Sequence, residues 1–278
     1  MSVIDVGYLR QWIGIPKDDR DVLAARHARL MAATLDLDPG ALHPGAPLPP
    51  LWHWLYFWAI ARRSALGDDG HPRQGILPEL PEGRRMWAGS SVTFHRPLAI
   101  GAEVTRHSTV RDVTEKAGRG GRLIFIEVAH EIADHDGPAL TDRHHIVYRP
   151  PPDGSPPRPP EPAPKTADLS QAWQADPTLL FRYSALTYNG HRIHYDQPYA
   201  TGEEGYPGLV VHGPLLATLM AGAAQALQPE RPLASFAFRA TAPVFADEPF
   251  TVLADRGGAV WVRRADGGYA SRGEVAWI

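Results

Sequence analysis

Apolar and polar residues alternate in two separate parts of the chain, in the pattern of half-buried β-strands. In the first part residues 91–94 alternate in this way, and residues 103–110 form a second strand candidate. In the second part residues 235–238 and 250–254 repeat the same succession. The pattern therefore predicts that the chain contains two related sets of strands.

Turn signals and final strands support this repeat. Asp136-Gly137 and Asp266-Gly267 are dipeptides typical of tight β-hairpins. Each is followed, at the same interval, by a last strand candidate, residues 144–148 and 274–278. Because the corresponding segments occur in the same order in both halves, we predict one supersecondary unit that is present twice.

An apolar segment with helical character precedes each set of strands. Residues 214–227 carry no charge and are apolar on all sides, which is typical of a helix buried in a core. Residues 50–63 are rich in tryptophan and, like the other segment, begin with a proline that suits a first helical turn. A further amphipathic helix is predicted over residues 21–35.

The repeated unit is thus a long buried helix wrapped by a curled antiparallel sheet. Two such units predict an α+β fold of the double-hotdog type. Residues 149–166 are dominated by proline, which favours an extended linker that joins no sheet. We therefore expect an N-terminal hotdog at residues 1–148, a linker, and a C-terminal hotdog at residues 167–278.

The composition is that of a folded protein, and it excludes several classes of function. Of the 278 residues, 44% are hydrophobic and 21% are charged. The net charge of -3 argues against a nucleic-acid partner, which requires a basic surface. The absence of cysteine excludes disulfides, a thiolate nucleophile and a cysteine-ligated metal. No segment predicts a membrane span or a signal peptide, so we expect a cytoplasmic protein.

Candidate chemistry is concentrated in the second half, between residues 181 and 214. Asn189, His191, His194 and Asp196 lie within eight positions of one another. Shortly afterwards Gly213 opens the predicted buried helix. The free N–H groups at the start of a helix can hold a developing oxyanion, so we expect an acid–base residue beside such a site.

These residues carry a family resemblance. Thr187, Asn189, Ile193, His194 and Asp196 fall in register on the pattern Ser/Thr-Gly-Asp-x-Asn-Pro-x-His-x-Asp. The segment resembles the catalytic half of MaoC-like, type 2 hydroxyacyl-thioester dehydratases, in particular the double-hotdog branch that includes mesaconyl-C4-CoA (3-methylfumaryl-CoA) hydratases. The resemblance implies a hydro-lyase that acts on the thioester of coenzyme A or of acyl carrier protein and needs no cofactor or metal.

The match is incomplete at the catalytic pair. The aspartate of the family pattern is Asn189 here, and its Asn-Pro is His191-Arg192. An amide cannot accept a proton, so Asn189 can only position water or a hydroxyl group. The resemblance then leaves His194 as the base and gives the thioester carbonyl to the N–H of Gly213. Supporting roles are expected for Asp196, His191 and Thr187.

The resemblance also favours a short, branched dicarboxylic acyl-CoA as substrate. A free carboxylate on the acyl group would require an arginine, and the sequence offers three candidates that it cannot rank: Arg182, Arg192 and Arg239. The alternative is dehydration of 3-hydroxyacyl groups in fatty acid or polyketide synthesis. A homodimer is a further possibility, although two hotdogs in one chain already mimic the common hotdog dimer.

Each site residue also has a structural interpretation. His194 could be an ordinary loop histidine, Asn189 a turn residue, and Asp196 a partner within the loop. Gly213 could simply let the chain enter the helix, and we expect His212 to be a packing residue. A metal site on His191, His194 and Asp196 is not favoured, because no further clustered ligand is evident.

Two other functional classes are less well supported. A hotdog thioesterase would need a carboxylate on the central helix, and residues 214–227 contain none. A binding protein with a vestigial site would not need Asn189, His194 and Gly213 together. The first half has Leu48-Pro49 where the second has His212-Gly213, so we expect one active site per chain, at the seam of the two units, with the first half as scaffold and pocket wall.

Overall fold

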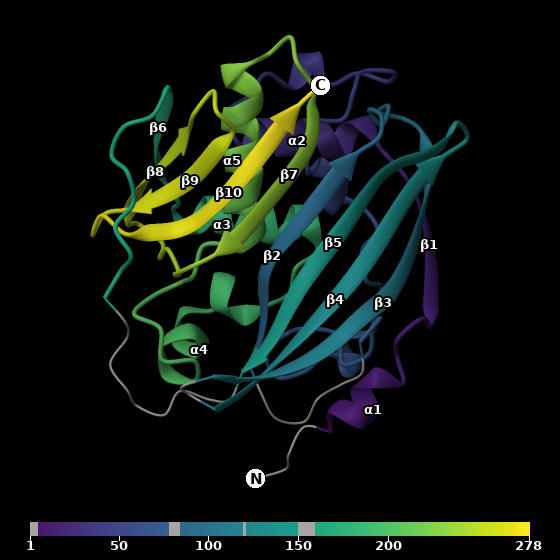
Figure 1. Cartoon of the computed structure of the whole chain (residues 1–278), viewed down its shortest axis with the longest axis vertical. Helices are drawn as coiled ribbons and strands as arrows, with labels where there is room; N and C mark the ends of the chain where they lie inside the picture. Colours follow the sequence, from purple (N-terminus) through teal and green to yellow (C-terminus); the bar gives the residue numbers. More distant parts are fainter. Residues whose placement is uncertain (1–4, 78–83, 119–120, 150–158) are drawn as a thin grey trace.

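One continuous antiparallel sheet of ten strands organises the molecule, in the order β1-β3-β4-β5-β2-β7-β10-β9-β8-β6 (Figure 1). The computed structural model describes residues 5–77, 84–118, 121–149 and 159–278. The strands are β1 Pro16–Val22, β2 Arg84–Phe94, β3 Glu103–Gly118, β4 Gly121–Asp134, β5 Gly137–Arg149, β6 Leu169–Gln174, β7 Leu233–Ala240, β8 Pro249–Ala254, β9 Ala259–Arg264 and β10 Tyr269–Trp277.

The two halves of the sheet have the same topology, which confirms the predicted repeat and the double-hotdog fold. From one edge of the sheet the strands of the first half are arranged as β1-β3-β4-β5-β2. From the other edge the strands of the second half have the equivalent order β6-β8-β9-β10-β7. The halves meet where β2 pairs with β7, with Ser91 opposite Ala237. A Cβ atom on Gly89 would lie 2.1 Å from the carbonyl oxygen of Phe238, so glycine is required for this close approach.

Both Asp-Gly dipeptides occupy the hairpins predicted for them. Asp136-Gly137 joins β4 to β5, and Asp266-Gly267 joins β9 to β10. Gly137 and Gly267 have φ angles of +101° and +88°, a region that glycine adopts without strain. The expected strands at residues 91–94, 103–110, 235–238 and 250–254 all lie within observed strands.

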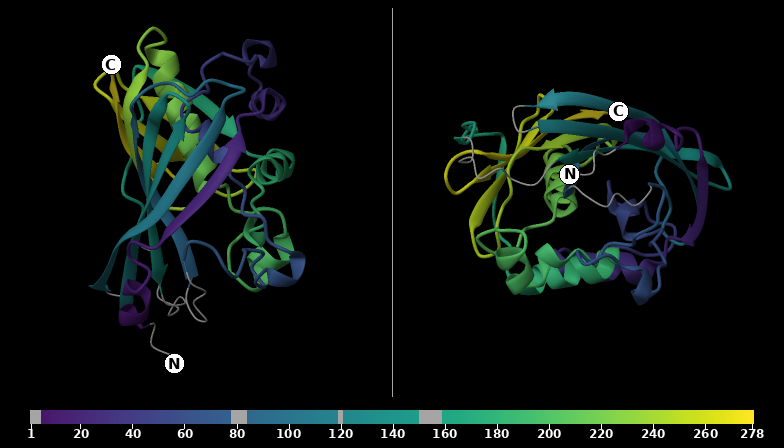
Figure 2. Two further views of the ribbon diagram at one scale, coloured as in Figure 1. Left: turned by 90° about the vertical axis from the view of Figure 1, so that its right-hand side faces the viewer. Right: turned by 90° about the horizontal axis from the view of Figure 1, so that it is seen from below.

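The C-terminal half also contains the predicted central helix, α5 Gly213–Leu227. It crosses the concave face of its half-sheet and packs against β6, β7, β8, β9 and β10 (Figure 2). Nine of its residues are buried, among them Leu215, Leu216 and Met220. The uncharged sequence suits this position, because most of the helix is buried and only Gly222 and Ala226 are exposed.

The N-terminal half has no corresponding long helix in the residues described, so the helix predicted over residues 50–63 is wrong. Only a short 3-10 turn, η2 Trp52–Leu55, forms there. Leu51 and Phe57 have φ angles of +67° and +60°, which end any regular helix on both sides of the turn. The apolar pattern did predict burial correctly, because Leu51, Trp52 and Leu55 are all in the core.

A buried carboxylate anchors this short turn to the sheet. Asp142 on β5 accepts hydrogen bonds from His53 Nε2 at 3.0 Å and Trp54 Nε1 at 2.7 Å. It also accepts from His144 Nε2 at 2.9 Å and from the hydroxyl of Ser90 on β2. Burial disfavours the charged carboxylate, but the neighbouring His144 and His53 outweigh burial and hold the pKa of Asp142 well below its usual value.

The remaining elements lie outside the sheet and at its edge. The helix predicted over residues 21–35 is shorter, α2 Ala25–Thr34, because Asp21 and Val22 belong to β1. The carboxylate of Asp21 accepts from the backbone N–H groups of Val22 and Phe57. The other helices are α1 Val6–Arg10, α3 Pro177–Thr187 and α4 Gln197–Gly202, and the other 3-10 turns are η1 Pro39–Ala41, η3 Arg63–Ala65 and η4 Arg192–His194.

The linker predicted at residues 149–166 is described from residue 159 onwards. Contrary to expectation, this part does contact the sheet: Pro162 forms an isolated bridge with Gly268, and Ala163 packs with Leu253 and Trp261. Proline lacks the N–H donor, but its carbonyl and those of its neighbours still accept hydrogen bonds, as Pro164 does from Trp261 Nε1. Residues 150–158 lie outside the described residues.

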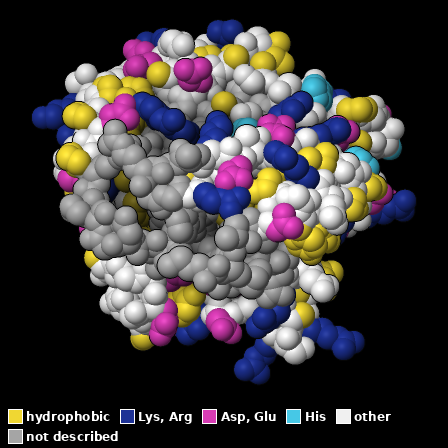
Figure 3. Space-filling model, turned by 60° about the horizontal axis from the view of Figure 1, so that its bottom comes forward, with side chains coloured by type: hydrophobic (Ala, Val, Ile, Leu, Met, Phe, Trp, Pro, Cys, Tyr) yellow, Lys and Arg dark blue, Asp and Glu magenta, His cyan; other side chains and the backbone are white. Residues whose placement is uncertain are grey.

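The surface has no uniformly basic field on the face shown in Figure 3. Acidic and basic side chains are mixed among the residues described there. None of the helices that the structure describes combines the length and the apolar character needed to cross a lipid bilayer.

Candidate active site

The predicted site residues lie on the segment between α3 and α5. Helix α3 ends because Tyr188 adopts a left-handed conformation with φ 51°. The chain then turns through Asn189 into η4, whose last residue is His194. The carboxylate of Asp196 accepts from the N–H of Tyr199 at 3.2 Å and so caps α4.

His194 is buried and held in one tautomer. Its Nδ1 lies 2.7 Å from the carbonyl oxygen of Val210, which can only accept, so Nδ1 carries the hydrogen and Nε2 has the free lone pair. Burial lowers the pKa of His194 to about 4, against the opposing effect of the Val210 carbonyl. The imidazole is therefore neutral at pH 7, as a general base must be before it takes a proton.

The start of α5 lies next to this imidazole. The rings of His194 and His212 stack with centroids 3.7 Å apart, and His212 is the N-cap residue of α5. No side chain caps the helix, so the N–H of Gly213 is among its unsatisfied donors. This places His194 beside a helix terminus that can accept a developing negative charge.

His212 is a packing residue, as expected, but it packs on the candidate base. Its Nε2 lies 2.8 Å from the hydroxyl of Ser184 on α3. Burial and the neighbouring His194 hold the pKa of His212 well below its usual value, so both stacked rings are neutral. This stacking was not predictable from the sequence, because only the folded chain brings the two histidine rings together.

Two of the expected site residues are engaged in local structure. The Oδ1 atom of Asn189 accepts from the backbone N–H of His191 at 3.0 Å, which is a turn of the kind that asparagine favours. Thr187 donates its hydroxyl hydrogen to the carbonyl of Tyr183 at 2.7 Å, one turn back in α3. The contact of Thr187 thus stabilises the end of α3, and that of Asn189 shapes the loop that follows.

The three arginine candidates lie in different surroundings. Arg192 is already paired with Asp196 at 2.7 Å, and its guanidinium lies over the ring of Tyr199. Arg182 is exposed on α3. Arg239 lies on the face of β7 opposite α5, where it lines a groove with Arg272. The reason is strand alternation, since Phe238 next to it is buried on the α5 side.

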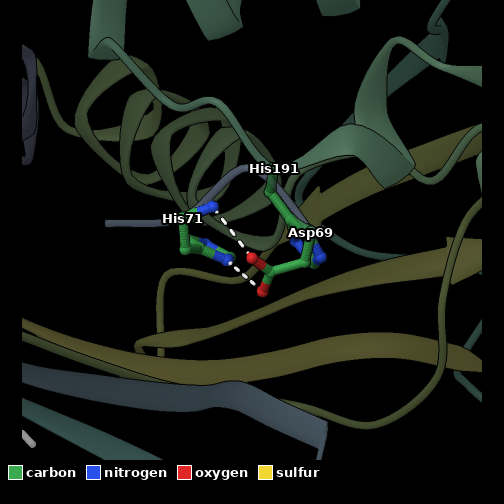
Figure 4. A group of neighbouring side chains, drawn as sticks. All are labelled: Asp69, His71 and His191. Atoms are coloured by element: carbon green, nitrogen blue, oxygen red, sulfur yellow. Dashed lines mark hydrogen bonds and ion pairs between the residues drawn. The ribbon is translucent and has the colours of Figure 1, made fainter. Parts of the chain in front are cut away.

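The N-terminal half contributes two side chains that sequence analysis missed, Asp69 and His71 (Figure 4). His71 Nδ1 lies 2.9 Å from Asp69 Oδ2, and its backbone N–H donates to Asp69 Oδ1, also at 2.9 Å. The ring of His71 lies 4.4 Å from that of His191. A Gly-Asp-Asp-Gly-His run at residues 67–71 was the available signal, although nothing in it indicated a contact with the second half.

The electrostatics of this group follow from its contacts. Burial opposes ionisation of Asp69, but the hydrogen bonds and charge of His71 outweigh burial and lower the pKa of Asp69 to about 2. Burial, together with the neighbouring His71 and His194, lowers the pKa of His191 to about 2. His191 is therefore a neutral ring, with His71 and Asp69 on one side and His194 at 5.4 Å on the other.

Asp69, His71 and His191 offer one potential ligand atom each within 4.8 Å. Both carboxylate oxygens of Asp69 accept hydrogen bonds from His71, and each oxygen keeps a further lone pair. The observed contacts of the group are those of a hydrogen-bonded carboxylate–imidazole pair beside His191.

Backbone contact between the halves fixes the position of this pair. A Cβ atom on Gly70, which has φ +88°, would lie 1.9 Å from the carbonyl oxygen of Gly190. The N–H of Arg192 donates to the carbonyl of Asp69 at 2.9 Å. The segment bearing Asp69 and His71 thus packs directly on the loop that bears His191 and His194.

We expect Gly70→Ala to lower kcat by about 10²-fold, because the added methyl group forces the two loops apart and displacements of about 1 Å at a site have effects of this size. The matched control is Gly75→Ala, since a Cβ atom at Gly75 meets no atom within 4 Å. Steady-state kinetics of both variants test the prediction. A Gly70→Ala protein with the wild-type kcat would show that the contact does not position the site.

A cation also acts on this region. Arg85 on β2 opposes the rise in pKa that burial causes at Tyr148, and its charge contributes to the lowered pKa of His191. Arg85 is exposed. The charge of Arg85 therefore acts on His191, a neighbour of His194. Sequence analysis did not single out this arginine.

A family model described as hydroxyacyl-thioester dehydratase type 2 matches residues 51–246, which is more than half of the chain. The chain belongs to this family. The matched residues include Asp69, His71 and the loop that bears His194. The resemblance expected from the sequence is thus confirmed.

Relatives and solved structures agree with this assignment. The chain is 46% identical over 247 residues to mesaconyl-C(4)-CoA hydratase of Chloroflexus aurantiacus, covering 87% of each chain. It is 24% identical to the mitochondrial type 2 hydroxyacyl-thioester dehydratase of Schizosaccharomyces pombe, covering 90% of this chain and 89% of the relative.

Solved structures at low identity support the fold. A MaoC-like dehydratase from Phytophthora capsici superposes with a TM-score of 0.72 at 15% identity, covering 99% of both chains. A Mycobacterium tuberculosis protein described as having a double hotdog fold superposes with a TM-score of 0.54 at 15% identity, covering 96% of both chains.

Proposed function

We propose that this family member is a hydro-lyase that adds water to an α,β-unsaturated acyl-CoA, and that its substrate is mesaconyl-C4-CoA, giving a citramalyl-CoA-type product. The observation that carries the proposal is the neutral His194 with its free Nε2, stacked on the N-cap residue of α5. The identity of 46% to a mesaconyl-C(4)-CoA hydratase supports the choice of substrate.

The geometry suits activation of the thioester. The N–H of Gly213 would donate to the thioester carbonyl, which makes the β-carbon, C3, electrophilic and stabilises the enolate that forms. One such donor is worth about 2.7–4 kcal/mol in the transition state. The macrodipole of α5 acts in the same direction.

His194 then acts as the base. Its Nε2 takes one proton from water while the water oxygen bonds to C3 and the π electrons move to the thioester carbonyl. The resulting enolate takes up a proton at C2, which restores the carbonyl and completes the addition of one water molecule. A positioned base of this kind contributes about 10²–10⁴-fold to the rate.

The second carboxylate of mesaconyl-C4-CoA is attached to the carbon that receives the hydroxyl group. It would therefore lie close to the water that His194 activates, and a cation should be near it. We propose Arg85, an exposed arginine of β2 whose charge acts on His191, as this cation. The guanidinium of Arg192 is paired with Asp196 instead.

We expect Arg85→Gln to raise KM for mesaconyl-C4-CoA by about 10- to 100-fold, the effect of losing a charge-assisted hydrogen bond, and to leave KM for crotonyl-CoA unchanged. The control is Arg111→Gln, an exposed arginine that pairs with Glu131. Equal effects on both substrates would assign Arg85 to another role, such as contact with the phosphates of coenzyme A.

Dehydration of 3-hydroxyacyl groups carried by acyl carrier protein is the alternative. The similarity to the type 2 dehydratase of S. pombe favours it at the level of the family. Parallel assays of mesaconyl-C4-CoA, crotonyl-CoA and a crotonyl-carrier-protein thioester, with products identified by mass spectrometry, test the proposal. Conversion of crotonyl thioesters alone would support the alternative and overturn the dicarboxylic substrate.

The arrangement of the chain fits this function. We infer that the base and the thioester-binding N–H belong to a unit at residues 167–278, and that residues 1–148 provide the scaffold and the pocket wall, in a cytoplasmic enzyme. A homodimer is compatible with the fold, since closed symmetric dimers are common among soluble proteins. Sedimentation equilibrium tests the oligomeric state.

A further inference from the structure

We propose that Asp69 and His71 form an acid–base dyad of the active site and supply, through His191, the proton that C2 takes up during hydration. This inference rests on the proposed function and extends it. It gives the N-terminal half a chemical role, where sequence analysis expected only a scaffold and pocket wall.

The dyad has the hydrogen-bond pattern of a working acid–base pair. The carboxylate of Asp69 accepts from His71 Nδ1–H at 2.9 Å and is fixed by the backbone N–H of the same residue (Figure 4). Because Nδ1 is engaged, Nε2 of His71 is the nitrogen available for proton exchange. A carboxylate in this position holds the ring in one tautomer and stabilises the imidazolium.

His191 connects the dyad with the base. A ring nitrogen of His191 lies within 4.8 Å of a nitrogen of His71 and of an oxygen of Asp69, a separation that one water molecule can bridge. On its other side the His191 ring lies perpendicular to that of His194, with centroids 5.4 Å apart. The three imidazoles and the carboxylate thus form one continuous group at the seam of the two hotdogs.

The reaction needs this second group because Asn189 cannot provide it. An amide neither accepts nor donates a proton as an acid–base catalyst, and Asn189 Oδ1 is occupied by the N–H of His191. The family pattern has a carboxylate at this position of the C-terminal half. Here Asp69, from the other half, brings a carboxylate to the same loop.

The proton transfers balance as follows. His194 takes one proton from water, whose oxygen bonds to C3, and the enolate forms. The protonated His71 gives its Nε2 proton to His191 through one water molecule, while the other nitrogen of His191 gives its proton to C2. His191 therefore stays neutral throughout. The proton on His194 then passes to His71 through His191 in the reverse direction, which restores the original tautomer of His191, and the net reaction is the addition of one water molecule.

Several titratable and charged groups face the dyad and would influence its pH dependence. From the C-terminal half these are His191, His194, Tyr199 and the Arg192–Asp196 pair; from the sheet they are Arg85 on β2 and Tyr148 on β5. The His71 ring itself is hydrogen-bonded to Asp69.

The dyad is partly exposed, with side-chain exposures of 32% for His71 and 40% for Asp69. Substitution there should therefore leave the core intact, in contrast to substitution of the buried His194. This makes a kinetic effect separable from unfolding.

The test is the pH profile of kcat/KM for hydration of mesaconyl-C4-CoA by the wild type, His71→Gln and Asp69→Asn, with Asp68→Asn as the matched control. Asp68 is the adjacent aspartate, and its side chain is fully exposed. We expect His71→Gln to lower kcat by about 10²-fold and to abolish the fall in rate on the alkaline side, which reflects loss of the dyad's proton. We expect Asp69→Asn to move that alkaline limb to lower pH, because the amide no longer stabilises the imidazolium.

Retention of both the wild-type kcat and the alkaline limb in His71→Gln would overturn the inference and leave the proposed function standing. A wild type that hydrates none of the thioesters would instead overturn the proposed function, and the dyad's role with it. Loss of wild-type activity on treatment with a chelator, restored by a divalent metal, would also overturn the inference, since the group would then be a metal site.

Discussion

We expect His194→Ala to lower kcat for thioester hydration by about 10²–10⁴-fold with little change in KM. The reason is that Nε2 of His194 is the free nitrogen of a neutral imidazole beside the start of α5, while its Nδ1 is fixed on Val210. The group acts on water in the transition state and not on the bound thioester, so the loss should fall on kcat.

His194→Gln separates this chemical effect from a packing defect. Glutamine fills more of the buried space than alanine and can still donate to the Val210 carbonyl, but it cannot take a proton. We expect it to be as inactive as His194→Ala while its thermal unfolding is closer to the wild type. His135→Gln, at an exposed histidine, is the control. A glutamine variant with wild-type kcat would show that another group is the base.

We also expect the free energy of unfolding to fall strongly at mildly acid pH. Four histidines, three of them buried and His191 partly buried, have lowered pKa values in the folded protein: His194 at about 4, His191 at about 2, and His130 and His212 well below their usual value. Burial is the largest cause in each. In the unfolded chain these groups take up protons near pH 6.5. The unfolded state therefore binds more protons below pH 6.5, and the folded state loses stability as the pH falls.

We expect the free energy of unfolding to fall by about 1.4 kcal/mol per pH unit for each of these histidines once the pH is well below 6.5. For His194 the loss continues down to about pH 4. The carboxylates of Asp69 and Asp142, whose pKa values are lowered, still stabilise the fold throughout this range and cease to do so only at lower pH.

Urea unfolding at pH 7.5, 6, 5 and 4.5 measures this dependence. His130→Gln should reduce the slope by the share of one histidine, and His135→Gln should not change it. A free energy of unfolding that is constant between pH 7.5 and 4.5 would contradict the assignment of these groups as neutral in the folded protein.

The fold was predictable where apolar residues recur at the spacing of one type of secondary structure. Helix α5 was found because residues 214–227 are apolar on every side, and the strands because they alternate. The prediction of a helix at residues 50–63 was wrong because large apolar side chains, here Leu51, Trp52 and Leu55, can be buried in any backbone conformation. The geometry of this segment is set instead by Asp142, which binds His53 and Trp54 from a distant strand.

The candidate site was predictable in part for a similar reason. One short segment contains His194, Asn189 and Asp196, so their spacing alone indicated that they lie close together. The contacts of His191 with Asp69 and His71 exist only because Gly70 and Gly190 bring two halves of the chain together. The sequence could not rank the three arginine candidates, because only the fold shows that Arg239 lies on the outer face of β7 and that Arg192 pairs with Asp196 of its own loop.

The most direct test of the account is the loss of enoyl-thioester absorbance when the wild-type enzyme is added to mesaconyl-C4-CoA, measured beside crotonyl-CoA under the same conditions. The account predicts rapid loss with mesaconyl-C4-CoA, a much lower kcat/KM with crotonyl-CoA, and a rate of loss about 10²–10⁴-fold lower with His194→Ala. Stable absorbance of both thioesters in the presence of folded wild-type enzyme would contradict it.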